Sequence, residues 1–225
     1  MGLIERISRI FRSSPKDSQA EVRDAVRSVY ALVPRFDDLT RDLNDLMTPA
    51  LRAREHITIL EDLDKNRVIV ALASPPPSWV VFIGHGLEES LILDSTIHQR
   101  VAAEDFHRVH SVHGICAYCC NSGAVMGRSV SRSGKPFIGF RREIGFCSGA
   151  DPGEPVSREF VGFVEVALDG FRDLIPLAEL DFNFRNWFDK KILDLAQEGN
   201  HYSRLIKIAL RDQRSAFVFL YPEVN

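Results

Sequence analysis

The sequence predicts an α/β fold in which a mostly parallel central sheet lies between layers of helices. Short apolar runs alternate along the chain with segments whose apolar residues recur at helical spacing. The run at residues 79–83, Trp-Val-Val-Phe-Ile, contains no polar residue, as is typical of a strand buried on both faces of a parallel sheet. Alternation of this kind indicates a three-layer α/β/α sandwich.

Residues 1–54 are expected to form a helical N-terminal extension. Three apolar stripes at helical spacing run through it, separated by proline-containing breaks. The first stripe consists of Leu3, Ile4, Ile7, Ile10 and Phe11. The second consists of Val22, Val26, Val29, Tyr30 and Val33. The third consists of Phe36, Leu39, Leu43 and Leu46, and its helix is expected to end near Pro49. We expect the extension to pack on the sandwich or on a second chain.

Residues 55–225 are expected to form the main domain. Short apolar, β-branched or aromatic runs predict its strands, at 57–60, 79–83, 91–93, 109–118, 137–140 and 216–220. Helical spacing of apolar residues predicts its helices, at 61–72, 99–107, 123–131, 156–170, 184–197 and 200–211.

Composition and charge narrow the class of protein. The chain has 225 residues, of which 45% are hydrophobic and 26% charged, as in an ordinary globular protein. Its net charge of −3 gives no electrostatic case for nucleic-acid binding. The apolar runs are too short for a transmembrane segment, and Arg6, Arg9 and Arg12 interrupt any secretory signal. We therefore expect a cytoplasmic protein.

The four cysteines are not spaced as a disulfide framework. Three of them, Cys116, Cys119 and Cys120, fall within five positions. Without a secretory signal, such clustering indicates catalysis, metal binding or plain core packing. We expect Cys116 and Cys147 to be inert core residues.

A histidine and a cysteine follow two of the expected strands. His85 comes two residues after the strand at 79–83, and Cys120 comes two residues after the strand that ends at Tyr118. In open α/β sheets, reactive groups gather beyond the carboxyl ends of the strands. If these strands are neighbours, about 4.8 Å apart, both side chains can face one substrate carbonyl.

These residue types suit nucleophilic catalysis. A thiolate is the nucleophile, and a nearby imidazole or helix N-terminus stabilises it. We expect Cys120 to lie just before a helix that starts near Gly123, so both influences are plausible there. His85 would also protonate the leaving amine. The backbone N–H groups of Gly86 and Cys120 would stabilise the developing oxyanion.

Several segments together resemble the CHAT family of caspase-like peptidases. They are "VVFIGHG", "LILDS", "RVAAEDF" and "VHGICAYCCNSG", followed by "GKPFIGFRREI", "SREFVGFVEVALDG" and "SAFVFLY". The resemblance covers about residues 56–222, and it places Cys120 at the position of the nucleophile and His85 at that of the histidine. It implies a caspase-like α/β/α sandwich that cleaves proteins with a Cys-His dyad and needs no cofactor. It also implies a specific protein substrate, an activating protein partner and, for several bacterial members, a part in anti-phage defence.

The resemblance leaves the preference at the cleavage site open. Two residues before the nucleophile, many basic-specific caspase-like peptidases have an acidic residue and caspases have glutamine, whereas this chain has Tyr118. Candidate substrate contacts are Tyr118, Arg141 with Arg142 for an acidic side chain, and Asp94 for a basic one.

The same residues are compatible with other kinds of site. His113, Cys116, Cys119 and Cys120 form an H-x2-C-x2-C-C run that suggests a zinc site, but alternation along a strand directs His113 and Cys116 to opposite faces. A thioredoxin-like pair should open a helix, and Cys116 falls inside a strand. Gly84-His85-Gly86 begins like a dinucleotide fingerprint but lacks the third glycine. A catalytically silent caspase-like interaction module remains an alternative.

Overall fold

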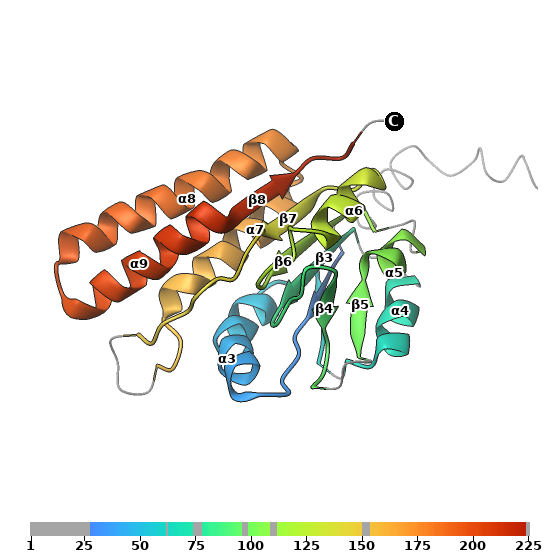
Figure 1. Ribbon diagram of the computed structural model, residues 1–225, viewed down its shortest axis with the longest axis horizontal. Helices are drawn as coiled ribbons and strands as arrows, with labels where there is room; N and C mark the ends of the chain where they lie inside the picture. Colours follow the sequence, from blue (N-terminus) through green and yellow to red (C-terminus); the bar gives the residue numbers. More distant parts are fainter. Residues whose placement is uncertain are drawn as a thin grey trace, which may run out of the picture.

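Six strands form one sheet through the centre of the molecule (Figure 1). The structure is a computed structural model that describes residues 28–61, 63–73, 78–95, 99–108, 112–149 and 154–223. From one edge to the other, the strands are β2 (Ile57–Leu60), β1 (Val29–Leu32), β3 (Trp79–Ile83), β6 (Gly114–Tyr118), β7 (Phe137–Phe140) and β8 (Phe217–Leu220). All neighbouring pairs are parallel except β7 and β8. The predicted α/β class with a mostly parallel sheet is confirmed.

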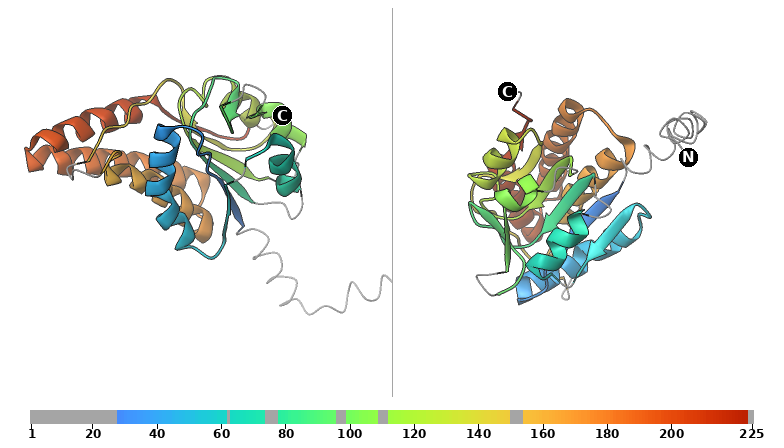
Figure 2. Two further views of the ribbon diagram at one scale, coloured as in Figure 1. Left: turned by 90° about the horizontal axis from the view of Figure 1, so that it is seen from below. Right: turned by 90° about the vertical axis from the view of Figure 1, so that its right-hand side faces the viewer.

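Helices cover both faces of this sheet, as a three-layer sandwich requires (Figure 2). One face packs against the four longer helices, α3 (Asp38–Arg52), α7 (Val161–Asp173), α8 (Leu177–Glu198) and α9 (His201–Ala216). A short 3-10 helix (Arg158–Phe160) leads into α7. The other face packs against α4 (Lys65–Ala73), α5 (Ala103–Arg108) and α6 (Met126–Arg132), together with a hairpin of β4 (Ser90–Ile92) and β5 (Arg100–Ala102). The paired helices α8 and α9 extend well beyond the sheet (Figure 1).

Period-two alternation along each strand separates the two cores. In β6, Cys116 and Tyr118 point to the face of the long helices, whereas Ile115 and Ala117 point to the other face. Both sets are buried, which is why the strand has no polar residue.

The expectation of an N-terminal extension ending at residue 54 is wrong for the described part of that segment. Residues 29–33 are not helical, because Val29–Leu32 forms β1 between β2 and β3. The helix at Phe36 to Pro49 is present as α3, and it continues past Pro49 to Arg52 and packs on the same sheet. The first stripe, as well as Val22 and Val26, lies outside the described residues.

The expectation of a helix at residues 29–33 is wrong for a physical reason. Val29, Tyr30 and Val33 fit one face of a helix, but they belong to an uninterrupted apolar run that equally fits a strand buried on both faces. Pairing on both sides decides in favour of the strand. A smaller difference concerns residues 99–107, where Arg100–Ala102 is strand β5 and the helix starts at Ala103.

Candidate active site

The strands that precede His85 and Cys120 are neighbours in the sheet, which is the condition that the sequence argument required. β3 and β6 pair in parallel with Ile83 opposite Tyr118, and the Gly84 N–H donates to the Tyr118 carbonyl oxygen at 3.4 Å. His85 and Cys120 each follow these paired residues by two positions, so both come just after the carboxyl ends of adjacent strands. The register thus brings an imidazole and a thiol to the carboxyl edge of two adjacent strands.

Gly86 packs directly against the backbone of the cysteine segment. A Cβ atom at this position would clash with the Cys120 carbonyl oxygen and would lie 2.6 Å from Sγ of Cys119. Gly86 also forms an isolated antiparallel bridge with Leu91, which ties this segment to the β4–β5 hairpin. Its lack of a side chain is what permits the close approach.

The Cys120 thiol is partly exposed and contacts the loop that follows β7. The Ile144 N–H donates to Sγ of Cys120 at 3.4 Å, and the thiol lies 3.7 Å from the Ile144 carbonyl oxygen. Both backbone groups of Ile144 therefore contact the sulfur. This loop is also held to the cysteine segment by a bond from the Asn121 N–H to the Arg142 carbonyl oxygen, at 3.1 Å.

The chain turns sharply directly after Cys120. Asn121 has a φ of +56°, in the left-handed region that asparagine tolerates better than most residues. The Gly123 N–H then bonds to the Phe140 carbonyl oxygen at 2.8 Å, which fixes the turn to the end of β7. Consequently α6 begins at Met126 and not near Gly123 as expected. Cys120 therefore does not sit immediately before a helix, and the foreseen effect of a helix N-terminus on its thiol is not supported.

The other three cysteines lie in different surroundings. Cys116 and Cys119 are fully buried, and burial raises the pKa of each thiol well above its usual range. Burial also raises the pKa of the half-buried Cys147 thiol. The expectation that Cys116 and Cys147 are core residues agrees with these positions, since both pack in or against the core beside the long helices.

The structure gives no support to a metal site at the cysteine run. Cys116 belongs to the core beside the long helices and Cys119 to the core on the opposite face of the sheet. Within the described ranges, no group of three or more His, Cys, Asp or Glu side chains is placed to hold a metal ion.

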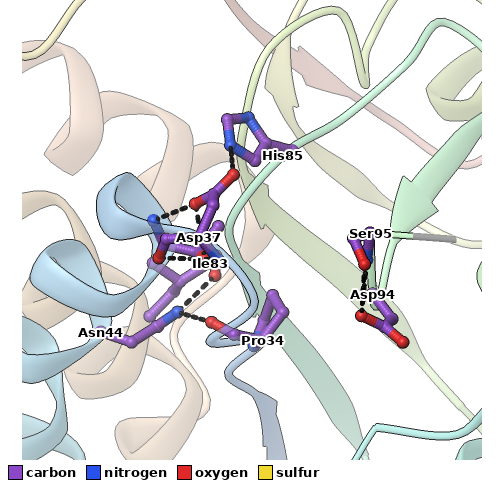
Figure 3. Close-up of polar contacts among 8 residues, drawn as sticks. Pro34, Asp37, Asn44, Ile83, His85, Asp94 and Ser95 are labelled. Atoms are coloured by element: carbon purple, nitrogen blue, oxygen red, sulfur yellow. Dashed lines mark hydrogen bonds and ion pairs between the residues drawn. The ribbon is translucent and has the colours of Figure 1, made fainter.

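His85 has a carboxylate partner that the sequence did not reveal. Its Nε2 atom lies 2.8 Å from Oδ2 of Asp37, and the two side chains are 34% and 41% exposed, respectively (Figure 3). The Phe36 ring lies beside the imidazole, with 5.8 Å between the ring centroids. Asp37 precedes α3, so the contact joins residues that are 48 positions apart.

Asp37 is also the N-cap of α3. Its Oδ1 accepts hydrogen bonds from the backbone N–H and the hydroxyl of Thr40, both at 2.8 Å, and Thr40 Oγ1 accepts from the Asp37 N–H in return. Burial would raise the pKa of the Asp37 carboxyl, but the Thr40 hydrogen bonds and the adjacent His85 outweigh it, so that the pKa is lowered.

Asn44 connects α3 to the ends of two strands. Its buried side-chain amide donates to the carbonyl oxygens of Pro34, at 2.6 Å, and of Ile83, at 3.1 Å (Figure 3). Pro34 follows β1 and Ile83 is the last residue of β3. One side chain therefore fixes both strand ends just before the segment that carries His85.

Tyr118, expected as a substrate contact, is fully buried. Its hydroxyl donates to Oε1 of Gln213 at 2.9 Å, and its ring stacks on Phe163 with the centroids 4.4 Å apart. Tyr118 belongs to the core beside the long helices, and Cys120 packs against the same core. It supports the site from the core, and its burial argues against direct contact with a substrate.

The expected charged contacts lie outside this cluster. Arg141 donates to the Ser215 carbonyl oxygen, and Arg142 forms an ion pair with Asp212 at 2.6 Å, so both are engaged with the end of α9. Asp94 accepts a hydrogen bond from the Ser95 N–H, and Figure 3 shows this pair well apart from His85 and Asp37. None of the three makes a described contact with His85 or Cys120.

Comparison with known proteins adds no family assignment. The sequence matches no protein-family model, and none of the curated proteins is significantly similar to it. None of the described helices has both the length and the apolar character needed to cross a membrane.

Proposed function

We propose that the chain is a cysteine peptidase in which Cys120 is the nucleophile and His85 transfers the protons. The observation that carries the proposal is the β3–β6 register, which puts both residues two positions beyond paired strand ends. A partly exposed thiol beside an N–H donor, and an imidazole with a carboxylate partner just after the adjacent strand, form an arrangement suited to nucleophilic catalysis.

The chemistry follows from these groups. Sγ of Cys120 attacks the carbonyl carbon of a peptide bond, and His85 donates a proton to the departing amine as the C–N bond breaks. A water molecule then attacks the thioester and gives its proton to His85, which releases the carboxylic acid and restores the thiol. The N–H groups of Gly86 and Cys120 stabilise the oxyanion at each addition step.

The resemblance to CHAT-family peptidases supports a caspase-like fold for the sandwich and a specific protein as substrate. The same resemblance supports activation by a protein partner and a part in anti-phage defence. The loop that follows β7 contacts the Cys120 sulfur through both backbone groups of Ile144. Movement of this loop would widen access to the thiol, and a bound partner could control that step.

The test is cleavage of candidate proteins encoded beside this gene, with wild type, Cys120→Ala and His85→Ala. We expect each substitution to lower the cleavage rate by about 1,000-fold or more. Cys116→Ala and Cys119→Ala serve as matched controls, because both thiols are buried in the core, and they should leave cleavage near the wild-type rate. Cleavage that persists in folded Cys120→Ala would refute the proposal. An absence of any cleavage would favour the silent interaction module.

A further inference from the structure

The Asp37 carboxylate uses its two oxygens for different partners. Oδ1 accepts from Thr40 in the first turn of α3, and Oδ2 contacts Nε2 of His85. Because the hydrogen bonds of the helix cap fix the side-chain torsions of Asp37, its second oxygen points in one direction. The imidazole that bonds to this oxygen is therefore restricted as well.

The backbone on either side of this contact is also fixed from α3. The Asn44 amide bonds to the Pro34 and Ile83 carbonyl oxygens, which immediately precede the Asp37 and His85 segments. Thr48, one turn further along α3, donates its hydroxyl to the Asn44 carbonyl oxygen at 2.6 Å. The start of α3 thus holds both the ring of His85 and the strand end from which it projects (Figure 3).

From this geometry we infer that Asp37 is the positioning residue of His85: it fixes the ring and the tautomer through which the imidazole exchanges protons with Cys120. The inference rests on the proposed peptidase function. In the neutral imidazole, Nε2 carries the hydrogen and donates it to Oδ2 of Asp37, so Nδ1 has the free lone pair. Figure 3 shows this second ring nitrogen on the side away from the carboxylate.

The proton balance then involves three groups. Nδ1 of His85 accepts the proton of the Cys120 thiol, which leaves a thiolate and an imidazolium. Asp37 keeps its negative charge throughout and stabilises the imidazolium through Nε2–H. When the amine departs, Nδ1 returns the proton to it, and the imidazole is again neutral with its Nε2–H bonded to Asp37.

The other charged groups near this contact are either paired elsewhere or exposed. Two charged residues flank Asp37, and each forms an ion pair with a residue of α3. Arg35 pairs with Asp45, and Asp38 pairs with Arg41. From the loop after β7, Arg142 pairs with Asp212, and Glu143 is exposed. Just after the end of β6, the partly exposed titratable group is Cys120, whose sulfur contacts Ile144. From the segment after His85, Glu88 and Glu89 are exposed.

The experiment compares the full-length wild type with Asp37→Asn, Asp37→Ser and Asp38→Asn. Asparagine and serine cap helices about as well as aspartate, so the first two variants keep α3 capped but remove the carboxylate from His85. Asp38→Asn is the matched control. It removes the same charge one residue away, where the side chain is 92% exposed and pairs with Arg41.

Two readouts are needed. The first is the steady-state kinetics of cleavage. Both Asp37 variants should lose roughly 10- to 100-fold in kcat with little change in KM, because they lose the orientation of the His85 imidazole and not the binding of substrate. The second is ¹⁵N NMR of histidine-labelled protein at about pH 8.5, where an ordinary imidazole is neutral. We expect the Nε2–H tautomer of His85 in wild type and in Asp38→Asn. In Asp37→Asn the amide nitrogen would donate to Nε2 and favour the Nδ1–H tautomer, and Asp37→Ser should give a mixture of tautomers. His85→Gln identifies the resonances.

The two readouts fail independently. A wild-type Nδ1–H tautomer, or tautomers and kcat unchanged in both Asp37 variants, would overturn the positioning role. If no protein is cleaved by wild type, the peptidase proposal fails, while the NMR result still decides whether Asp37 fixes His85. If Asp38→Asn lowers kcat as much as the Asp37 variants do, the loss comes from removing one negative charge and not from the contact with His85. That result would also overturn the inference.

Discussion

The two faces of the central sheet are built differently. The face beneath α3, α7, α8 and α9 is aromatic: Phe163 of α7 lies 4.4 Å from the Tyr118 ring and 4.8 Å from that of Phe184, measured between centroids. The opposite face is mainly aliphatic and is covered by the three shorter helices and the β4–β5 hairpin. Figure 2 shows that the helices on the aromatic face are longer than those on the aliphatic face.

The candidate site draws on the two faces in different ways. Cys120 follows the strand position of Tyr118 and borders the aromatic core, and the partner of His85 comes from α3 on the same side. Cys119 belongs to the aliphatic core and packs against Gly86. The aromatic side thus supports the proposed nucleophile and histidine, whereas the aliphatic side borders the close approach of the two segments at Gly86.

The largest effect on stability is expected from the aromatic core. Phe163→Ala should lower the free energy of unfolding by about 3–5 kcal/mol, because it leaves a cavity at the centre of several ring contacts. Phe106→Ala, an equally buried phenylalanine on the aliphatic face, should cost less within the same range. Urea unfolding followed by circular dichroism measures both, and Phe163→Leu replaces the alanine variant if that does not fold. A larger loss for Phe106 would contradict the ranking of the two faces.

A smaller loss is expected from adding one methyl group at Gly86. In Gly86→Ala the new Cβ clashes with backbone, the Cys120 carbonyl oxygen, so a segment must move at a cost of about 1–3 kcal/mol. Cleavage should fall as well, because the shift separates the two segments of the site. Gly145→Ala is the control, since its Cβ would meet no atom within 4 Å. Equal stability and equal cleavage in the two variants would show that close approach at Gly86 is not required.

Tyr118→Phe tests whether Tyr118 acts from the core. It removes the hydroxyl that donates to Gln213 and should cost about 1 kcal/mol of unfolding free energy. Substrate KM should stay unchanged, because the ring is buried under the site. A clear rise in KM without loss of stability would restore Tyr118 as a substrate contact.

The smallest effect is the pH dependence contributed by Asp37. The pKa of this carboxyl is lowered in the folded chain, so its stabilising contribution is present above its ordinary value of 3.8 and is lost as pH falls through the folded value. The side chain is 41% exposed, which limits the contribution to less than about 1 kcal/mol. Unfolding of wild type and Asp37→Asn should therefore differ more at pH 7 than at pH 3. A difference that grows toward pH 3 would contradict the sign.

Much of this architecture could be predicted from sequence because the central strands are continuous apolar runs. The strand at 79–83 is recognisable in this way, and the run predicted as a strand at 109–118 contains β6 at 114–118. The candidate catalytic residues after these strands follow from the rule for parallel sheets. β1 was missed because its apolar residues fit a helix and a buried strand equally well, and pairing with β2 and β3 decides between them. The start of α6 was missed because bonds from the turn after Cys120 to β7 delay it.

The partner of His85 could not be predicted. Asp37 carries a local signal, since an aspartate three residues before Thr40 is typical of a helix N-cap. That signal says nothing about a histidine 48 residues later, because the contact exists only once β1 and β3 lie side by side. With β1 assigned to a separate helical extension, α3 had no expected position relative to His85.

The most direct test of the Cys120–His85 pair is covalent labelling of the intact protein with a mixture of peptidyl acyloxymethyl ketones, followed by peptide mass spectrometry. These probes are attacked by an activated thiolate and need no knowledge of the natural substrate. The account predicts an adduct on Cys120 in wild type, none on Cys116, Cys119 or Cys147, and loss of the adduct in His85→Ala. Equal labelling of Cys120 in wild type and His85→Ala, or labelling of Cys147 instead, would contradict it.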